Sequence, residues 1–144
     1  MVAMRRDHDS RVRVLLGEGQ EGERPNAAAR DTAGRSLRVA FQKRGEYDTV
    51  VAHSGPQVLR IVERELIDLV VLDVDLSPMG GLRTLRILRG IDELLPVILT
   101  SRAWTRHLLS EALHFEASSV LRTPVELEVL FETVRRLLME KLDE

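Results

Sequence analysis

One aspartate stands where an apolar run ends. Residues Leu69 to Leu72 are all apolar, and Asp73 follows them directly, ahead of Asp75 and a turn rich in Ser, Pro and Gly. A run that is apolar at every position predicts a strand buried on both faces, as in a parallel sheet covered by helices. Open α/β sheets bind their ligands at the carboxyl ends of such strands. Asp73 is therefore the first candidate for a functional carboxylate, and the alternative is that it only caps the following turn.

Strand and helix patterns alternate on both sides of Asp73. Strands are expected at residues 12–16, 49–52, 66–73, 96–99 and 119–121. Helices are expected between them, from apolar residues spaced by three and four. The last helix has the clearest stripe: Leu127, Leu130, Phe131, Val134, Leu137 and Leu138. Five strands alternating with five helices predict one α/β domain, built on a parallel sheet with right-handed crossovers.

Single residues mark two of the helix boundaries. The first helix pattern resumes at alanines 27–29, is clearer at Phe41, and is expected to end at Gly45. Ser54 precedes a Gly-Pro pair, which predicts the start of the second helix there. Residues 1–10 are expected to form a disordered tail, and 11–142 the domain.

Composition excludes several classes of function. The chain has 144 residues and a net charge of −2, so no global field attracts nucleic acid or an acidic membrane. It has no cysteine, which excludes disulfides and thiolate metal sites. No apolar run approaches the roughly 20 residues that span a bilayer, and aromatic residues are too few for base-stacking surfaces. A cytoplasmic protein without a membrane or direct nucleic-acid partner is expected.

Four motifs, in this order and spacing, resemble the receiver domains of two-component response regulators. They are Asp68-Leu-Val-Val-Leu-Asp73, Gly81-Leu82, Leu95-Pro96-Val-Ile-Leu99 and Leu121-Arg-Thr-Pro124. The resemblance covers about residues 11–142. It implies a flavodoxin-like, doubly wound, five-stranded parallel sheet with strand order 2-1-3-4-5 and five helices. It also implies an insertion near residues 19–34, because the first loop and helix are longer than in this family.

The resemblance implies that Asp73 accepts a phosphoryl group. The family places two acids at the end of the first strand, where this chain has Gly17 and Glu18. With one acid lost, Glu18, Asp73 and the main-chain carbonyl of Asp75 are the expected ligands of Mg²⁺, which is expected to bind weakly or not at all. No other cofactor is expected.

The remaining two family positions also differ here. The family hydroxyl at the end of the fourth strand corresponds to Ser101, with Thr100 as the alternative, and only one of these neighbours can face Asp73. The family lysine at the end of the fifth strand is replaced by Thr123, before a proline whose peptide bond the resemblance implies to be cis. Arg102 is the candidate substitute for the missing cation, although a simple exposed arginine is the alternative.

These residues support two hypotheses. The first is a phosphorelay receiver, phosphorylated on Asp73 by a histidine kinase or phosphotransfer protein, with weak phosphorylation because the site is incomplete. The second is a pseudo-receiver that acts as a protein interaction module without phosphorylation. Neither is an enzyme beyond self-catalysed aspartyl phosphorylation and dephosphorylation. In both, a downstream protein is expected on the face of the fourth helix, fifth strand and fifth helix, and homodimerisation stays open.

Overall fold

The structure is a computed structural model that describes residues 11–19 and 29–142. Strands and helices alternate along it: β1 (Arg13–Gly17), α1 (Leu37–Arg44), β2 (Asp48–Ala52), α2 (Gly55–Arg64), β3 (Leu69–Asp73), α3 (Gly81–Ile91), β4 (Val97–Ser101), α4 (Arg106–His114), β5 (Ser119–Arg122) and α5 (Leu127–Leu142). The expected tail at 1–10 and part of the expected insertion lie outside the described residues. In the described part of the chain, no helix has the length and apolar character needed to cross a bilayer.

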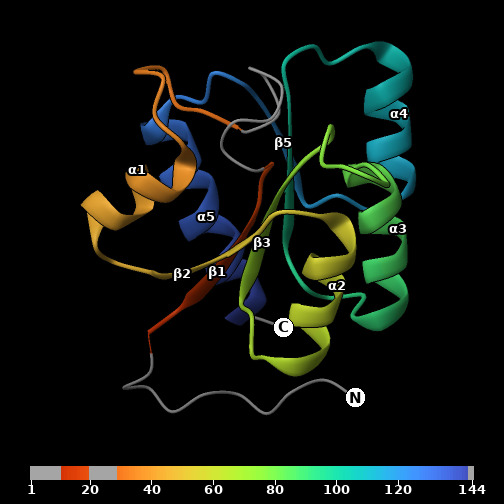
Figure 1. Ribbon diagram of the computed structural model, residues 1–144, viewed down its shortest axis with the longest axis horizontal. Coiled ribbons are helices and arrows are strands. Elements are labelled where there is room, and N and C mark those ends of the chain that lie inside the picture. The colour runs from red at the N-terminus through yellow and green to blue at the C-terminus, as the bar shows by residue number, and fades with distance from the viewer. Residues whose placement is uncertain (1–10, 20–28, 143–144) are drawn as a thin grey trace.

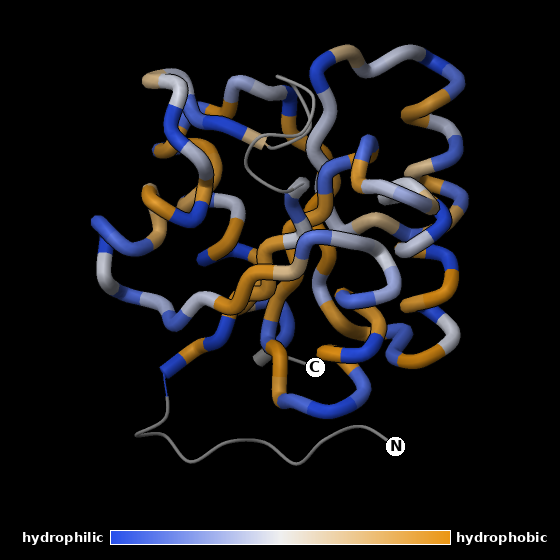
Figure 2. Tube along the Cα trace, viewed as in Figure 1, coloured by the Kyte–Doolittle hydropathy of each residue, from blue (hydrophilic) through white to orange (hydrophobic). Residues whose placement is uncertain are grey.

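The five strands form one parallel sheet in the order β2-β1-β3-β4-β5, which confirms the expected fold (Figure 1). Every residue of β3 and β4 is buried. This burial explains why these strands are apolar along their length instead of alternating, because helices cover the sheet on both sides. Figure 2 shows the result as a hydrophobic centre with hydrophilic turns around it.

Each face of the sheet has its own core. The face under α1 and α5 buries alternate strand residues together with both helices: Val14, Leu16, Leu69, Val71, Ile98, Leu37, Phe41, Leu130, Phe131 and Val134. The other face packs under α2, α3 and α4: Leu15, Val70, Leu72, Val97, Leu99, Val58, Leu85, Leu88 and Ala112. Figure 1 shows this division, with α1 and α5 on one side and the other three helices opposite. Two independent cores hold the sheet edge in a fixed position.

The expected helix boundaries are largely confirmed. Ser54 is the N-cap of α2, and its hydroxyl accepts a hydrogen bond of 3.2 Å from the N–H of Gln57. Gly45 ends α1 with a φ of 74°, in the left-handed region that favours glycine. The expected extension of the first helix back to Ala29 is wrong, because Ala29 is not helical and α1 begins at Leu37.

Residues 30–36, which we call the Asp31 hairpin, replace that helical extension. Arg30 bridges Ser36 in antiparallel fashion, and Asp31 bridges Val125 in parallel, just beyond β5. The main chain adds hydrogen bonds of 2.8 Å from the Val125 N–H to the Arg30 carbonyl and 3.1 Å from the Thr32 N–H to the Val125 carbonyl. This hairpin therefore joins the entry of α1 to the loop between β5 and α5.

Candidate functional site

The carboxyl ends of the strands meet at one edge of the sheet. Gly17 of β1 pairs with Leu72 of β3, so Glu18, just after β1, and Asp73, the last residue of β3, lie at the ends of neighbouring strands. Asp73 also pairs with Thr100 of β4. The expected site requires β1 and β3 to be adjacent, and they are. Both carboxylates are buried at this edge, which is where an α/β sheet presents its ligand-binding groups.

Asp73 is a buried carboxylate held by two hydrogen bonds. Its Oδ1 accepts from the N–H of Asp75 and its Oδ2 from the hydroxyl of Thr100, each at 2.9 Å. Burial raises the pKa of Asp73, the two hydrogen bonds lower it, and the charge of Asp75 raises it, which places the pKa at about 6. Within the described residues, no ion pair joins Asp73 to an arginine or lysine. Asp73 is thus ionised at neutral pH, and among the described residues no cation is paired with it.

The two candidate hydroxyls of β4 have different contacts. Thr100 lies opposite Asp73 in the strand register and donates to its carboxylate. The hydroxyl of Ser101 instead donates to the carbonyl and accepts from the N–H of Ala103, both at 3.3 Å. The spacing from Pro96 favours Ser101, whereas the structure brings Thr100 to the carboxylate.

The end of β1 contains one carboxylate and one glycine. A β-carbon placed on Gly17 would lie 2.7 Å from Cδ2 of Leu72 and 3.1 Å from side-chain atoms of Leu76 and Val58. The space of a second acid is therefore filled by apolar side chains. Glu18 is buried next to it, and its main-chain N–H donates to Ala52 at 2.9 Å. In the described part of the chain, no group of three or more His, Cys, Asp or Glu residues is arranged to hold a metal ion.

The end of β5 lacks a lysine. Thr123 is buried, and its main-chain N–H donates to the carbonyl of Ser101 at 2.9 Å. The peptide bond to Pro124 is cis, as the resemblance implies. Arg122 is exposed, on the neighbouring position of the strand. A threonine at this position supplies a hydroxyl but no positive charge.

A pocket opens beside the site between the β3–α3 and β4–α4 connections. Its volume is about 530 Å³, and its lining comprises Val74, Asp75, Leu82, Ser101, Arg102, Ala103 and Leu108. Arg102 is exposed and is the basic residue of this lining. The pocket therefore combines a cation with an acid, a hydroxyl and an apolar wall.

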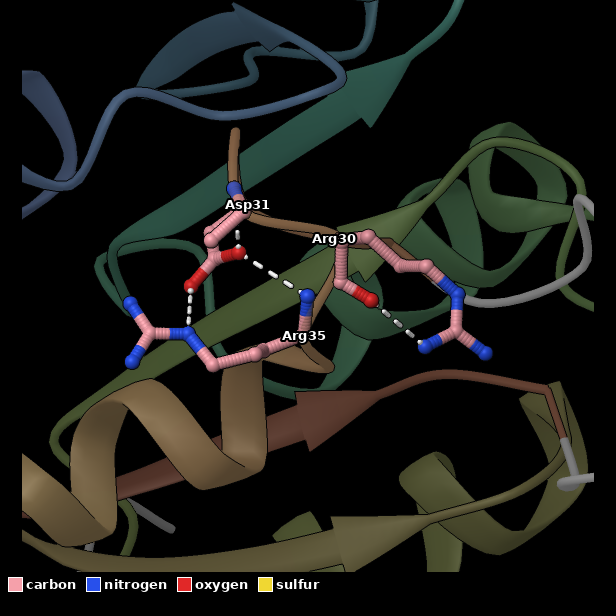
Figure 3. A network of polar contacts seen from close by, with 5 residues as sticks. Arg30, Asp31 and Arg35 are labelled. Atoms are coloured by element: carbon pink, nitrogen blue, oxygen red, sulfur yellow. Dashed lines mark hydrogen bonds and ion pairs between the residues drawn. The ribbon is translucent and has the colours of Figure 1, made fainter.

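The Asp31 hairpin is the feature of this edge that the sequence analysis missed. Oδ1 of Asp31 accepts from the N–H groups of Ala33 and Arg35, and Oδ2 accepts from Nε of Arg35, all at 2.9 Å (Figure 3). Burial raises the pKa of Asp31, but these hydrogen bonds and the charge of Arg35 outweigh it, so the pKa lies below its usual value. A turn signal was present in Asp31 and Gly34, the residue types favoured at the first and fourth positions of a type I turn.

Comparison with known proteins identifies the class. The model of the response regulator receiver domain matches residues 30–135. Solved structures agree with the fold: the signal receiver domain of an HD domain-containing protein from Pseudomonas fluorescens has a TM-score of 0.77 at 21% identity, covering 94% of this chain and 100% of that one. A CheY-like receiver protein from Methanospirillum hungatei has a TM-score of 0.75 at 20% identity, covering 93% and 98%.

Curated relatives point the same way. Sporulation initiation phosphotransferase F of Bacillus subtilis is 30% identical over 102 residues, which is 71% of this chain and 82% of that protein. Response regulator MprA of Mycobacterium tuberculosis is 34% identical over 104 residues, or 72% and 44%. The transcriptional regulatory protein ZraR of Escherichia coli is 29% identical over 92 residues, and the chain spans only 21% of its length. The chain belongs to the family of response regulator receiver domains of two-component signalling.

Proposed function

We propose that this receiver domain accepts a phosphoryl group on Asp73, slowly, from a histidine kinase or phosphotransfer protein in the cytoplasm. The observation that carries the proposal is the buried Asp73 carboxylate at the sheet edge, held by Asp75 and Thr100 next to a pocket that contains Arg102. A carboxylate in this position is ionised at neutral pH and can act as a nucleophile.

The reaction requires little covalent chemistry from the protein. One carboxylate oxygen of Asp73 forms a bond to phosphorus, the bond from phosphorus to the donor breaks, and the leaving group takes up a proton from solvent. The protein must orient the carboxylate and balance the charge of the transferring group. Arg102, at the rim of the pocket, is the candidate for that charge, because Thr123 cannot provide it.

Receiver domains typically bind Mg²⁺ at this site. The oxygen donors here fit that ion, but one carboxylate of the usual set is missing. The oxygen donors that would hold it are the carboxylates of Glu18 and Asp73 and the main-chain carbonyl of Asp75. Mg²⁺ accepts a site with one or two carboxylates when waters and phosphate complete its octahedron. Gly17 removes the third carboxylate, and leucine side chains fill its place, so weak binding follows. When bound, the ion neutralises charge on the transferring phosphoryl group.

The proposal is tested with a small phosphodonor and Mg²⁺, followed by intact mass measurement. The wild-type protein should slowly gain one phosphoryl group, and Asp73→Asn should gain none. Asp48→Asn is the matched control, because Asp48 is exposed and begins β2, at the end of the parallel sheet opposite to Asp73. Absence of an adduct in the wild type after prolonged incubation, or an adduct that persists in Asp73→Asn, would contradict the proposal.

A second candidate function is a phosphorylation-independent interaction module. Gly17 and Thr123 favour it, since each replaces a charged group of the family pattern. The downstream partner would bind the face of α4, β5 and α5, where Leu109 and Leu113 are exposed at 37% and 76%. This candidate predicts that Asp73→Asn leaves partner binding unchanged. The phosphorylation proposal predicts that treatment with the small phosphodonor alters partner binding by the wild type and not by Asp73→Asn.

A further inference from the structure

Thr100 contacts the Asp73 carboxylate directly. The two residues are register partners in adjacent parallel strands, so their side chains project from the same face of the sheet. Thr100 is 0% exposed and Asp73 is 3% exposed. The hydroxyl of Thr100 donates to Oδ2 at 2.9 Å, and this hydrogen bond is buried. A buried hydrogen bond to an ionised oxygen is stronger than a bond between neutral groups.

The second anchor of the carboxylate comes from the main chain. Oδ1 of Asp73 accepts from the N–H of Asp75, two residues along the turn. With one oxygen held by the turn and the other by Thr100, the carboxylate plane has a fixed orientation. Thr100 is well suited to hold it, because a β-branched side chain in a strand has few rotamers to lose. The neighbouring Ser101 uses its hydroxyl on Ala103 instead.

We propose that Thr100 is a positioning residue for phosphoryl transfer: its hydroxyl fixes Oδ2 of Asp73 so that the carboxylate meets the donor in one orientation. This inference rests on the proposed function of Asp73. Holding a reacting group in its productive geometry accounts for a large part of catalysis when little covalent chemistry is needed. The hydroxyl, and not the methyl group or the volume of the side chain, should therefore carry the effect.

The experiment compares phosphorylation rates of four proteins with a small phosphodonor and Mg²⁺. Thr100→Val keeps the shape and removes the hydroxyl, and its rate should fall by about tenfold or more, since small misplacements cost up to about 10²-fold. Thr100→Ser restores the hydroxyl and should recover most of the rate. Thr133→Val is the matched control, because Thr133 is a buried threonine of α5 whose hydroxyl donates to Val129 at 2.7 Å. Its rate should equal that of the wild type.

The rate comparison separates the two proposals. A wild type that gains no phosphoryl group defeats the proposed function of Asp73, and the role of Thr100 in transfer is overturned with it. A wild type that is phosphorylated while Thr100→Val keeps its rate, or while Thr100→Ser is as slow as Thr100→Val, overturns the inference about Thr100 alone.

Discussion

Two buried aspartates of this protein have opposite electrostatic surroundings. Asp31 is 1% exposed and Asp73 is 3% exposed, so burial disfavours the charge of both. Asp31 receives three hydrogen bonds, one of them from the guanidinium of Arg35, and its pKa is lowered. From the part of the chain that the structure describes, Asp73 receives two, neither from a cation, and its pKa is raised to about 6.

The difference separates a carboxylate that holds the fold together from one that is available for chemistry. The acceptor capacity of Asp31 is used within the Asp31 hairpin, which it stabilises. Asp73 has a donor on each oxygen but no ion pair within the described residues, so burial of its charge opposes folding. Strained or costly charges of this kind concentrate at functional sites.

The largest effect on stability is expected from Asp31→Ala. It leaves two main-chain N–H groups and Arg35 without their acceptor, and should lower the free energy of unfolding by about 2–4 kcal/mol. This value lies below that of a fully buried ion pair because the side chain of Arg35 is 36% exposed. Denaturant unfolding measures this. Because folding lowers the pKa of Asp31, the stabilisation from its charge is present above the unfolded pKa and is lost as pH falls through the folded pKa. The difference in unfolding free energy between the wild type and Asp31→Ala should therefore narrow in strong acid. Asp31→Asn, which keeps an acceptor, should lose less.

Asp73→Asn should act in the opposite direction. The folded pKa of Asp73, about 6, lies above its unfolded pKa. Between these two pKa values the folded state binds more protons than the unfolded state, so the free energy of unfolding falls as pH rises. Removing the charge should raise the free energy of unfolding by about 1–3 kcal/mol at pH 8 and by less at pH 5. Unfolding curves at both values check this. A destabilised Asp73→Asn protein at pH 8 would show that the charge of Asp73 is compensated.

Thr123→Lys would give Asp73 the counter-ion that Asp31 already has. An ammonium at this strand end should lower the pKa of Asp73 by about one pH unit or more. Carbon NMR titration of Asp73 measures the change, with Thr123→Val as the uncharged control. An unchanged pKa in the lysine variant would mean that this position does not reach the carboxylate.

The smallest effect is expected from Arg35→Lys. The charge beside Asp31 is kept, but the Nε–H hydrogen bond to Oδ2 is lost. The free energy of unfolding should fall by about 0.5–1.5 kcal/mol, the usual net value of one hydrogen bond. A loss as large as that of Asp31→Ala would mean that the guanidinium geometry, and not the main-chain hydrogen bonds, maintains the hairpin.

The fold followed from local patterns because each pattern had one physical solution. The apolar run before Asp73 could be buried on both sides only in a covered sheet, and Ser54 and Gly45 have the residue types that helix ends favour. The contact between Thr100 and Asp73 could not be obtained in this way. It depends on the register of two strands, and a shift of one residue would exchange Thr100 for Ser101.

The Asp31 hairpin escaped prediction for a related reason. Its turn residues are visible in the sequence, but its position depends on pairing with Val125, which lies 94 residues further along the chain by the difference 125 − 31. Local signals indicate that a turn forms and do not identify the distant segment on which it packs. Ala29, just before it, favours a helix but is not helical, because tertiary contacts override this preference.

The packing around Gly17 also limits which residues position 17 can accept. A change of Gly17 to aspartate would set a carboxylate against Leu72, Leu76 and Val58, where its charge would lose its hydration. An aspartate at this position therefore requires these side chains to move aside, and the exchange carries a cost in stability. The apolar packing around Gly17 thus opposes the introduction of a second acid at the end of β1.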